Sequence, residues 1–286
     1  MDNYSEIHFE FTIATAKLDL LIKTAIEIGN RMKGKQFPEN SPIYYSEGLG
    51  QKIINHILSV RNLLNGYQFS YGEILFAPKL DYSSIFVLTR AALETYLALN
   101  YVFIAENNET LKQFRFLCWD LAGYIERKDM TATTEEDKIK KQVEAEAIAT
   151  IKRELAENPI FKLLEQHDQK KALKGEWRLN FKWHDLAMKA GFSEAFFRQQ
   201  YKFLCCYAHA SRLSVIQIQQ NKTIEQQKEM VISAIDTLLM VLAKHMYDYI
   251  EIMPELKEIK NDMTKYQIIL NYKYIGDNFL QPNKKN

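Results

Sequence analysis

The sequence has few of the residues that interrupt helices and few of those that cross-link chains. Its 286 residues include only 10 glycines, 6 prolines and 3 cysteines. The cysteines, Cys118, Cys205 and Cys206, are odd in number and lack a CxxC spacing, which argues against a disulfide framework and a structural zinc site. The scarce glycines and prolines separate long segments with an apolar period of 3.6 residues, and this pattern predicts a predominantly helical protein.

An excess of charge of one sign is also lacking, since 37 Lys and Arg residues nearly cancel 36 Asp and Glu residues. A dedicated nucleic-acid-binding protein usually carries a basic excess, so contact with RNA would need a local basic patch. The P-loop motif, the full dinucleotide fingerprint, the HExxH zinc motif and the ExxH pair of di-iron bundles are all absent. The sequence therefore predicts neither a cofactor nor a metal site.

No export signal and no membrane span are expected. The first residues, MDNYSEIHFE, have neither the basic region nor the apolar run of a signal peptide. Residues 84–105 contain only two charged residues, Arg90 and Glu94, and each charge at a bilayer centre costs about 2.5–3.5 kcal/mol on insertion scales. We expect a buried helix there and, with the unpaired cysteines, a cytoplasmic protein.

The expected fold is all-α: an antiparallel helical bundle in one domain over residues 1–275, in preference to two intimate domains, with a frayed tail at 276–286. Residues 82–105 are apolar nearly all round and should lie at its centre, with residues 196–209 and 224–253 against them. The other expected helices cover 6–33, 44–64, 111–128, 134–157, 161–167, 183–189 and 256–272. Dimerisation through helix faces is a further expectation.

The segment 134–157 differs from the other helices in its composition. It is rich in acids and bases, has only a narrow apolar stripe, and begins with a TTEED capping signal. We expect a solvated helical excursion, or a surface for a protein partner.

Two opposite charges on the most apolar helix give the first candidate site. Arg90 and Glu94 are spaced i,i+4, and because desolvation of an ion costs several kcal/mol, they are expected to pair. One interpretation is a structural ion pair that fixes the helix register. The other is functional, with Arg90 binding an anion and Glu94 orienting a residue such as His209.

The second candidate is the segment 197–212, FRQQYKFLCCYAHASR. At 100° per residue, Arg198, Lys202, Cys205 and His209 fall within about 60° of one another, and Arg212 is expected one turn further on near the same line. An imidazole beside fixed cations suits acid–base chemistry on a phosphate. The alternative is a solvated surface stripe with a structural histidine. Cys205 and Cys206 are expected to be small buried hydrophobes.

Two motifs, RAALE at 90–94 and YKFLCCYAHAS at 201–211, give the chain a family resemblance. It resembles a group of uncharacterised bacterial all-helical proteins with an R-x-x-x-E helix followed by a Y-x-x-L-S-x-x-x-H-x-S helix. Tyr201, Ser211 and His209 match the second motif, while Cys205 stands in the place of its serine. More distantly the chain is similar to the HEPN superfamily, whose ribonuclease signature is R-x(4–6)-H. Here Lys202, with six intervening residues, is the nearest stand-in, because Arg198 is eleven residues before His209.

Two hypotheses of different classes follow, the first from the resemblance and the second from the polar residues and the near-zero net charge. In the first, the protein is a metal-independent ribonuclease of a bacterial stress or phage-defence (toxin–antitoxin) system, or its inactive relative. The roles would be His209 as acid–base group, Arg90 and Glu94 as polar support, and a phosphate-binding set of Arg198, Lys202, Arg212, Ser211 and Tyr201. In the second, the same residues bind a small anionic ligand or a protein partner without turnover. Neither mechanism needs a cofactor, and the sequence leaves open whether the protein is an enzyme.

Overall fold

In the computed structural model almost all regular structure is helical, which confirms the predicted all-α class. The structure describes residues 3–39, 41–75, 77–128 and 130–273, so the tail predicted at 276–286 lies outside the described residues. Contacts divide the chain into two compact units, Met1–Leu97 with Gly191–Asn286, and Ala98–Ala190. The single domain predicted over 1–275 stays a prediction, and the two units are described separately below.

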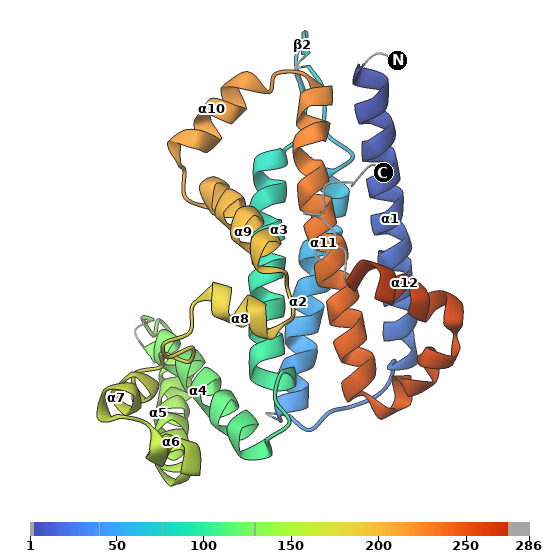
Figure 1. Ribbon diagram of the computed structural model, residues 1–286. Coiled ribbons are helices and arrows are strands. Elements are labelled where there is room, and N and C mark those ends of the chain that lie inside the picture. The colour runs from blue at the N-terminus through green and yellow to red at the C-terminus, as the bar shows by residue number, and fades with distance from the viewer. Residues whose placement is uncertain (1–2, 40, 76, 129, 274–286) are drawn as a thin grey trace. The chain divides into compact units, whose positions relative to one another are not determined.

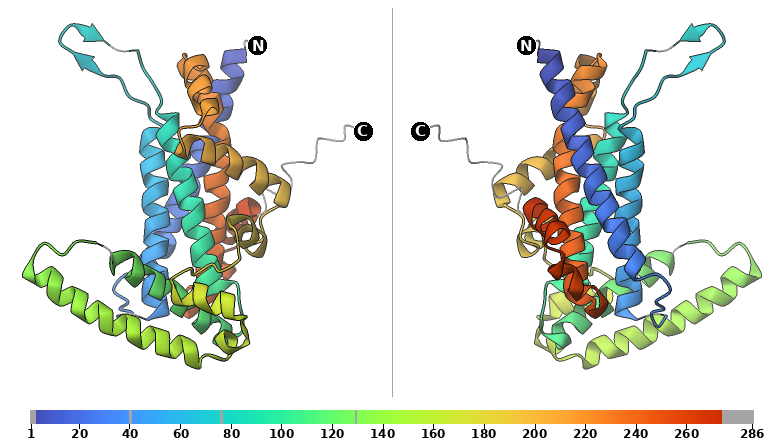
Figure 2. Two further views of the ribbon diagram at one scale, coloured as in Figure 1. Left: turned by 90° about the vertical axis from the view of Figure 1, so that its left-hand side faces the viewer. Right: turned by 90° about the vertical axis from the view of Figure 1, so that its right-hand side faces the viewer.

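The first unit is built on four long helices that lie side by side in Figures 1 and 2: α1 (Asn3–Arg31), α2 (Pro42–Leu63), α3 (Tyr82–Leu99) and α11 (Ile224–Ile252). Its other helical elements are α9 (Glu194–Ala208), α10 (Arg212–Gln220), a 3-10 helix (Pro254–Asn261) and α12 (Met263–Lys273). Apolar stripes at helical spacing explain this packing, as on α2, where Ile53, Ile57 and Val60 lie on one face and are fully buried.

Helix α11 has a segment that is buried on all sides, whereas the helix predicted at 82–105 exposes Val87 by 40%. Every residue from 237 to 246 is buried, and a capping box between Thr223 and Gln226 fixes where the helix begins. Within the described residues, α11 is also the one helix long and apolar enough to cross a membrane, and 72% of that apolar window is buried inside the protein. This burial is what the core helix of a soluble protein shows.

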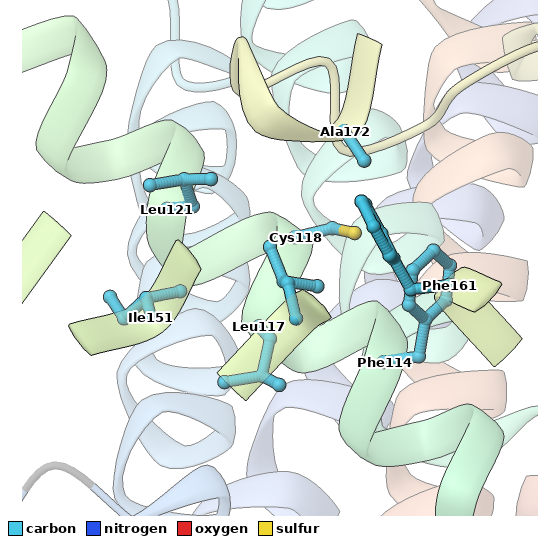
Figure 3. Packing of buried hydrophobic residues seen from close by; sticks show 8 residues of the cluster. Phe114, Leu117, Cys118, Leu121, Ile151, Phe161 and Ala172 are labelled. Atoms are coloured by element: carbon cyan, nitrogen blue, oxygen red, sulfur yellow. The ribbon is translucent and has the colours of Figure 1, made fainter. Parts of the chain in front are cut away.

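The second unit contains α4 (Glu109–Lys128), α5 (Glu135–Glu157), α6 (Pro159–Leu163), α7 (Gln166–Leu173) and α8 (Trp183–Lys189), preceded by a π-helical turn, Asn100–Ile104. Figure 3 shows its core, where side chains of α4 meet Ile151 of α5, Phe161 of α6 and Ala172 of α7. Burial there raises the pKa of the Cys118 thiol to about 12, so this cysteine is an inert core residue.

Helix α5 begins with the predicted cap, a capping box between Thr134 and Asp137. Its two ends differ in burial, because Ile139 and Val143 are exposed, while Ile151 and Leu155 are buried in the core of the unit. The first half of the helix is therefore solvated, and the second half anchors it.

Several element boundaries differ from the sequence predictions. Two expected single helices are interrupted, since 161–167 is divided between α6 and α7, and 256–272 between the 3-10 helix and α12. Arg212 does not continue the helix of His209; it begins α10, which the sequence analysis did not predict. Residues 66–80, which lie between two predicted helices, contain a β-hairpin.

The hairpin consists of β1 (Ser70–Tyr71) and β2 (Ile74–Leu75), with an outer bridge between Tyr67 and Lys79. Gly72 has a φ of 57° in the two-residue turn, a conformation that glycine adopts without strain. Figure 2 shows the hairpin projecting away from the helices of the first unit.

Candidate functional site

The predicted polar residues of α3 and α9 meet in the first unit. Arg90 and Glu94 come from α3, Tyr201 and Cys205 from α9, and His209 from the residue that follows α9. We call these five residues the Arg90 cluster. Each contact between the two helices joins residues more than a hundred positions apart in the chain.

Arg90 and Glu94 form the predicted ion pair. Arg90 Nε donates to Glu94 Oε1 at 2.8 Å, and their side chains are only 17% and 23% exposed. Burial lowers the pKa of the Arg90 guanidinium, but the charge and hydrogen bond of Glu94 outweigh it, and the net shift is upward. Arg90 is therefore held as a cation, with Nε committed to Glu94 and the terminal nitrogens directed elsewhere.

One of these terminal nitrogens meets the imidazole of His209. Arg90 Nη1 lies 3.0 Å from His209 Nε2, and the histidine side chain is exposed. A guanidinium offers donors and no acceptor, so Nε2 must accept this hydrogen bond. In this contact the imidazole is neutral, with its proton on Nδ1. The cluster thus presents a fixed cation beside a neutral, solvent-facing base.

Tyr201 fixes the carboxylate from the other side. Its hydroxyl donates to the same Glu94 Oε1 at 2.6 Å, and its ring lies 5.6 Å below the Arg90 guanidinium carbon. Phe197 stacks on this ring, with centroids 5.0 Å apart. Burial first, and then the nearby Glu94 carboxylate, raise the pKa of the Tyr201 phenol, so it stays a donor at neutral pH. Tyr201, predicted as a ligand-binding residue, thus contacts Glu94 in the structure.

The end of α9 sets the position of His209. His209 is the C-cap of the helix, and Ala210 follows with a φ of 42°. The amide of Ser211 donates to the carbonyl of Cys206 at 3.2 Å, which is the 6→1 hydrogen bond of a Schellman motif. An alanine in this left-handed conformation costs roughly 1 kcal/mol. The turn directs the His209 imidazole back toward Arg90.

Ser211 and Arg212 are used by the next helix. Ser211 is the N-cap of α10, where its hydroxyl oxygen accepts from the amide of Ser214 at 3.3 Å. Arg212 is the exposed first residue of α10, so it does not extend the stripe of α9 as the sequence predicted. Tyr207 ties the two helices together by donating to Gln217 at 2.7 Å.

The remaining predicted cations lie on the exposed side of α9. Arg198 pairs with Glu194 at 2.6 Å, and both side chains are more than half exposed. Eleven residues of helix place Arg198 about 16 Å from His209 along the axis. Lys202 is exposed on the same stripe and makes no ion pair with any described residue. The structure thus brings Arg90, Glu94, Tyr201 and His209 together, and leaves these two cations outside their hydrogen-bonded network.

Cys205 and Cys206 of α9, predicted as small buried hydrophobes, are only partly buried. Desolvation by burial raises the pKa of the Cys205 thiol, although the Arg90 charge opposes this shift. Cys206 Sγ lies 3.3 Å from the Lys202 carbonyl oxygen. A thiol with a raised pKa is a poor nucleophile, so Cys205 acts as packing beside Arg90. Among the residues that the structure describes, no three His, Cys, Asp or Glu side chains are placed to hold a metal ion.

Comparisons with known proteins give one match. The model of a family described as a family of unknown function, DUF5677, matches residues 47–228, which include every residue of the Arg90 cluster. No curated protein and no solved structure matches the chain. Because the matched region covers more than half of the sequence, the chain belongs to this family.

Proposed function

We propose that this member of the DUF5677 family is a HEPN-like protein of a bacterial stress or phage-defence system, and that its Arg90 cluster is the active site of a metal-independent ribonuclease. The observation that carries the proposal is the 3.0 Å contact between Arg90 Nη1 and His209 Nε2. It supplies a cation and a neutral imidazole side by side, although the R-x(4–6)-H spacing is absent from the sequence. The arginine comes from a second helix.

The proposed reaction uses the RNA's own 2′-hydroxyl as nucleophile. His209 Nε2 takes the proton of this hydroxyl while its oxygen attacks the adjacent phosphorus, and a 2′,3′-cyclic phosphate forms. The bond from phosphorus to the 5′-oxygen breaks, and the leaving oxygen takes a proton from water, while the proton on His209 neutralises the hydroxide that remains and restores the neutral imidazole. In this mechanism Arg90 leaves the imidazole and binds the non-bridging phosphate oxygens, where its planar guanidinium stabilises the added negative charge.

Glu94 and Tyr201 would position Arg90 in this reaction. Glu94 accepts from Nε alone, so the guanidinium can turn Nη1 toward a phosphate without losing its anchor. Tyr201 in turn restrains the carboxylate. Lys202 and Arg212, both exposed, would contribute to binding of the flanking phosphates, as the sequence analysis expected.

The test is cleavage of a labelled RNA oligonucleotide by the pure protein in the presence of EDTA. We expect products that end in a 2′,3′-cyclic phosphate, and we expect His209→Ala to reduce the rate about 100-fold or more. His167→Ala is the matched control, because His167 is an exposed histidine, 73% accessible, outside the cluster. Equal cleavage by wild type and His209→Ala would assign the activity to a contaminant and reject the proposal.

A second candidate is a non-catalytic sensor or scaffold that binds a small anion at the same residues. It is favoured by the charge balance, since Glu94 already neutralises Arg90 and the whole chain carries a formal charge of only +1. This candidate predicts that the protein binds phosphate or a nucleotide without cleaving RNA, and that Arg90→Met abolishes the binding. If wild type neither cleaves RNA nor binds these anions, both candidates fail.

A further inference from the structure

The β-hairpin of the first unit exposes an aromatic face. Tyr71 and Ile74 are directly opposite each other, so they share a face of the hairpin, and Tyr67 and Phe69 join them because alternate residues of a strand point the same way. These four side chains are between 53% and 75% exposed. Exposed apolar clusters of this kind mark binding surfaces in soluble proteins.

The two edges of the hairpin differ in their capacity to pair with another strand. Pro78, next to the bridge residue Lys79, lacks an amide hydrogen and therefore cannot donate to a strand that pairs with the second arm. The first arm, residues 67–71, contains no proline. Figure 2 shows that this arm stands clear of the helices of its unit, so a strand from elsewhere has room to approach it.

The hydrogen bonds of the first arm fix which of its backbone groups face outward. Tyr67 exchanges both of its backbone hydrogen bonds with Lys79 inside the hairpin, at 2.8 and 2.9 Å. In an antiparallel ladder such residues alternate with residues whose amide and carbonyl groups point to the other side. Gln68 and Ser70 therefore present their backbone groups at the outer edge, two residues apart and symmetrically about Phe69.

We propose that a second copy of this chain pairs with this edge, antiparallel and about a two-fold axis at Phe69. The sequence of the arm, Tyr-Gln-Phe-Ser-Tyr, is nearly palindromic, so it is its own complement in this register. Tyr67 of one copy lies opposite Tyr71 of the other, the outward-facing Gln68 and Ser70 form the hydrogen-bonded pairs, and the two Phe69 rings meet at the axis. An isologous contact of this kind closes on itself as a dimer.

The size and charge of the surface favour a second copy over a membrane. Four half-exposed side chains of this size cover about 500 Å² per copy and about 1,000 Å² in total, at the lower limit of specific interfaces. Insertion into lipid would carry Glu73, which lies in the hairpin turn, into the apolar layer. This inference is independent of the proposed ribonuclease.

The experiment measures the mass of the full-length protein by sedimentation equilibrium over a range of concentrations. We expect a monomer–dimer equilibrium with a Kd on the order of micromolar, as for a small interface. Phe69→Glu places two like charges at the axis and should raise the Kd at least tenfold. Leu75→Glu is the matched control, since it adds the same charge to an exposed position, 66% accessible, on the opposite face of the same hairpin.

A charge-reversal mixture gives the sharper test of the two-fold axis. Neither Phe69→Glu nor Phe69→Lys should dimerise alone, and an equimolar mixture should form the heterodimer, detected by native mass spectrometry. Unchanged circular dichroism would confirm that both variants fold. A monomeric wild type at all concentrations would overturn the proposal, as would a dimer that Phe69→Glu leaves intact. Sedimentation of the monomeric wild type with anionic vesicles, abolished by Phe69→Glu, would instead assign the face to a membrane.

Discussion

The two compact units each contain an arginine on a core helix with the same kinds of partners, a glutamate and a tyrosine ring. In the second unit, Arg115 of α4 lies 4.4 Å from the Tyr101 ring centroid, donates to the Tyr101 carbonyl at 3.1 Å and approaches Glu106 at 3.6 Å. In the first unit, Arg90 of α3 has Glu94 and Tyr201. The partner that differs is the third one, a buried carbonyl for Arg115 and an exposed imidazole for Arg90.

This difference separates a structural arginine from a candidate functional one. All partners of Arg115 lie within the fold, and its side chain is only 7% exposed. Arg90 has its ion-pair partner within the fold, and its remaining contact is a titratable group that faces solvent. An ion pair on an apolar helix thus does not by itself indicate a functional site. The second partner of Arg90, an imidazole that faces solvent, is what makes it a candidate.

The largest effect that tests this comparison is on stability. We expect Arg115→Met to lower the free energy of unfolding by about 3 kcal/mol, because it leaves a buried carbonyl and a partly buried carboxylate without their cation. Arg90→Met should cost about 1 kcal/mol, since Tyr201 still donates to Glu94. Thermal unfolding followed by circular dichroism measures both, with the exposed Arg127→Met on α4 as the control. An equal loss of stability in the two variants would show that Arg90, like Arg115, has a structural role.

The histidines extend the contrast between exposed and buried polar groups. His245 of α11 lies in the core, packed against Gly50, and burial lowers its pKa to about 4. A free imidazole titrates near 6.5, so between these values the unfolded chain binds a proton that the folded chain does not. His245 therefore does not lower the free energy of unfolding above about pH 6.5. The free energy of unfolding decreases as the pH falls from there toward 4. The loss between pH 7 and pH 5 is about 2 kcal/mol.

A non-titrating variant isolates this contribution. We expect the stability of His245→Gln to decrease by about 2 kcal/mol less than that of wild type between pH 7 and pH 5. The buried carboxyls Glu47 and Asp236, whose pKa values are raised by burial, titrate in both proteins and cancel in the difference. Urea unfolding at the two pH values measures it, and identical pH dependence would show that His245 is protonated inside the fold.

Replacing the guanidinium of Arg90 by an ammonium tests its geometry apart from its charge. Arg90→Lys keeps the cation near Glu94, but a single ammonium cannot hold the carboxylate and also present two parallel donors to a phosphate. We expect RNA cleavage to fall about tenfold, while thermal stability changes by less than about 1 kcal/mol. The cleavage assay of the proposed function measures it, with Arg198→Lys as the control. If Arg90→Lys cleaved RNA as fast as wild type, catalysis would depend on the positive charge at this position and not on the geometry of the guanidinium.

Local signals in the sequence predicted much of this fold. The apolar period of 3.6 residues predicted long helices at the positions where the structure has them. The capping signal at Thr134 predicted where α5 begins. The predicted helix at 196–209 ends close to where α9 ends, but the turn that separates Arg212 from α9 was missed, because Ala210 adopts a left-handed conformation without the glycine that usually announces one. The hairpin was missed although residues 67–71 alternate with a period of two, because its strands are only two residues long.

The candidate site could be predicted in part. The spacing of Arg90 and Glu94 predicted their ion pair, since i,i+4 neighbours on a helix are in contact. The contact of Arg90 with His209 spans 119 residues, and only the packing of α3 against α9 determines it. The role of Tyr201 depends on the same packing. The 100° rotation per residue therefore identified which residues share the stripe on α9. It could not tell which of them face α3 and which face solvent.

The smallest expected effects concern the cations that face solvent. Arg198 lies about 16 Å from His209 along α9 and already pairs with Glu194, so we expect Arg198→Ala to change RNA affinity and stability by less than about 0.5 kcal/mol. Lys202 is one turn closer to His209, and Lys202→Ala should weaken binding about threefold and reduce its salt dependence. Oligonucleotide titrations at two salt concentrations measure both. An equal loss for the two variants would show that RNA follows the whole stripe of α9, and that the site extends beyond the Arg90 cluster.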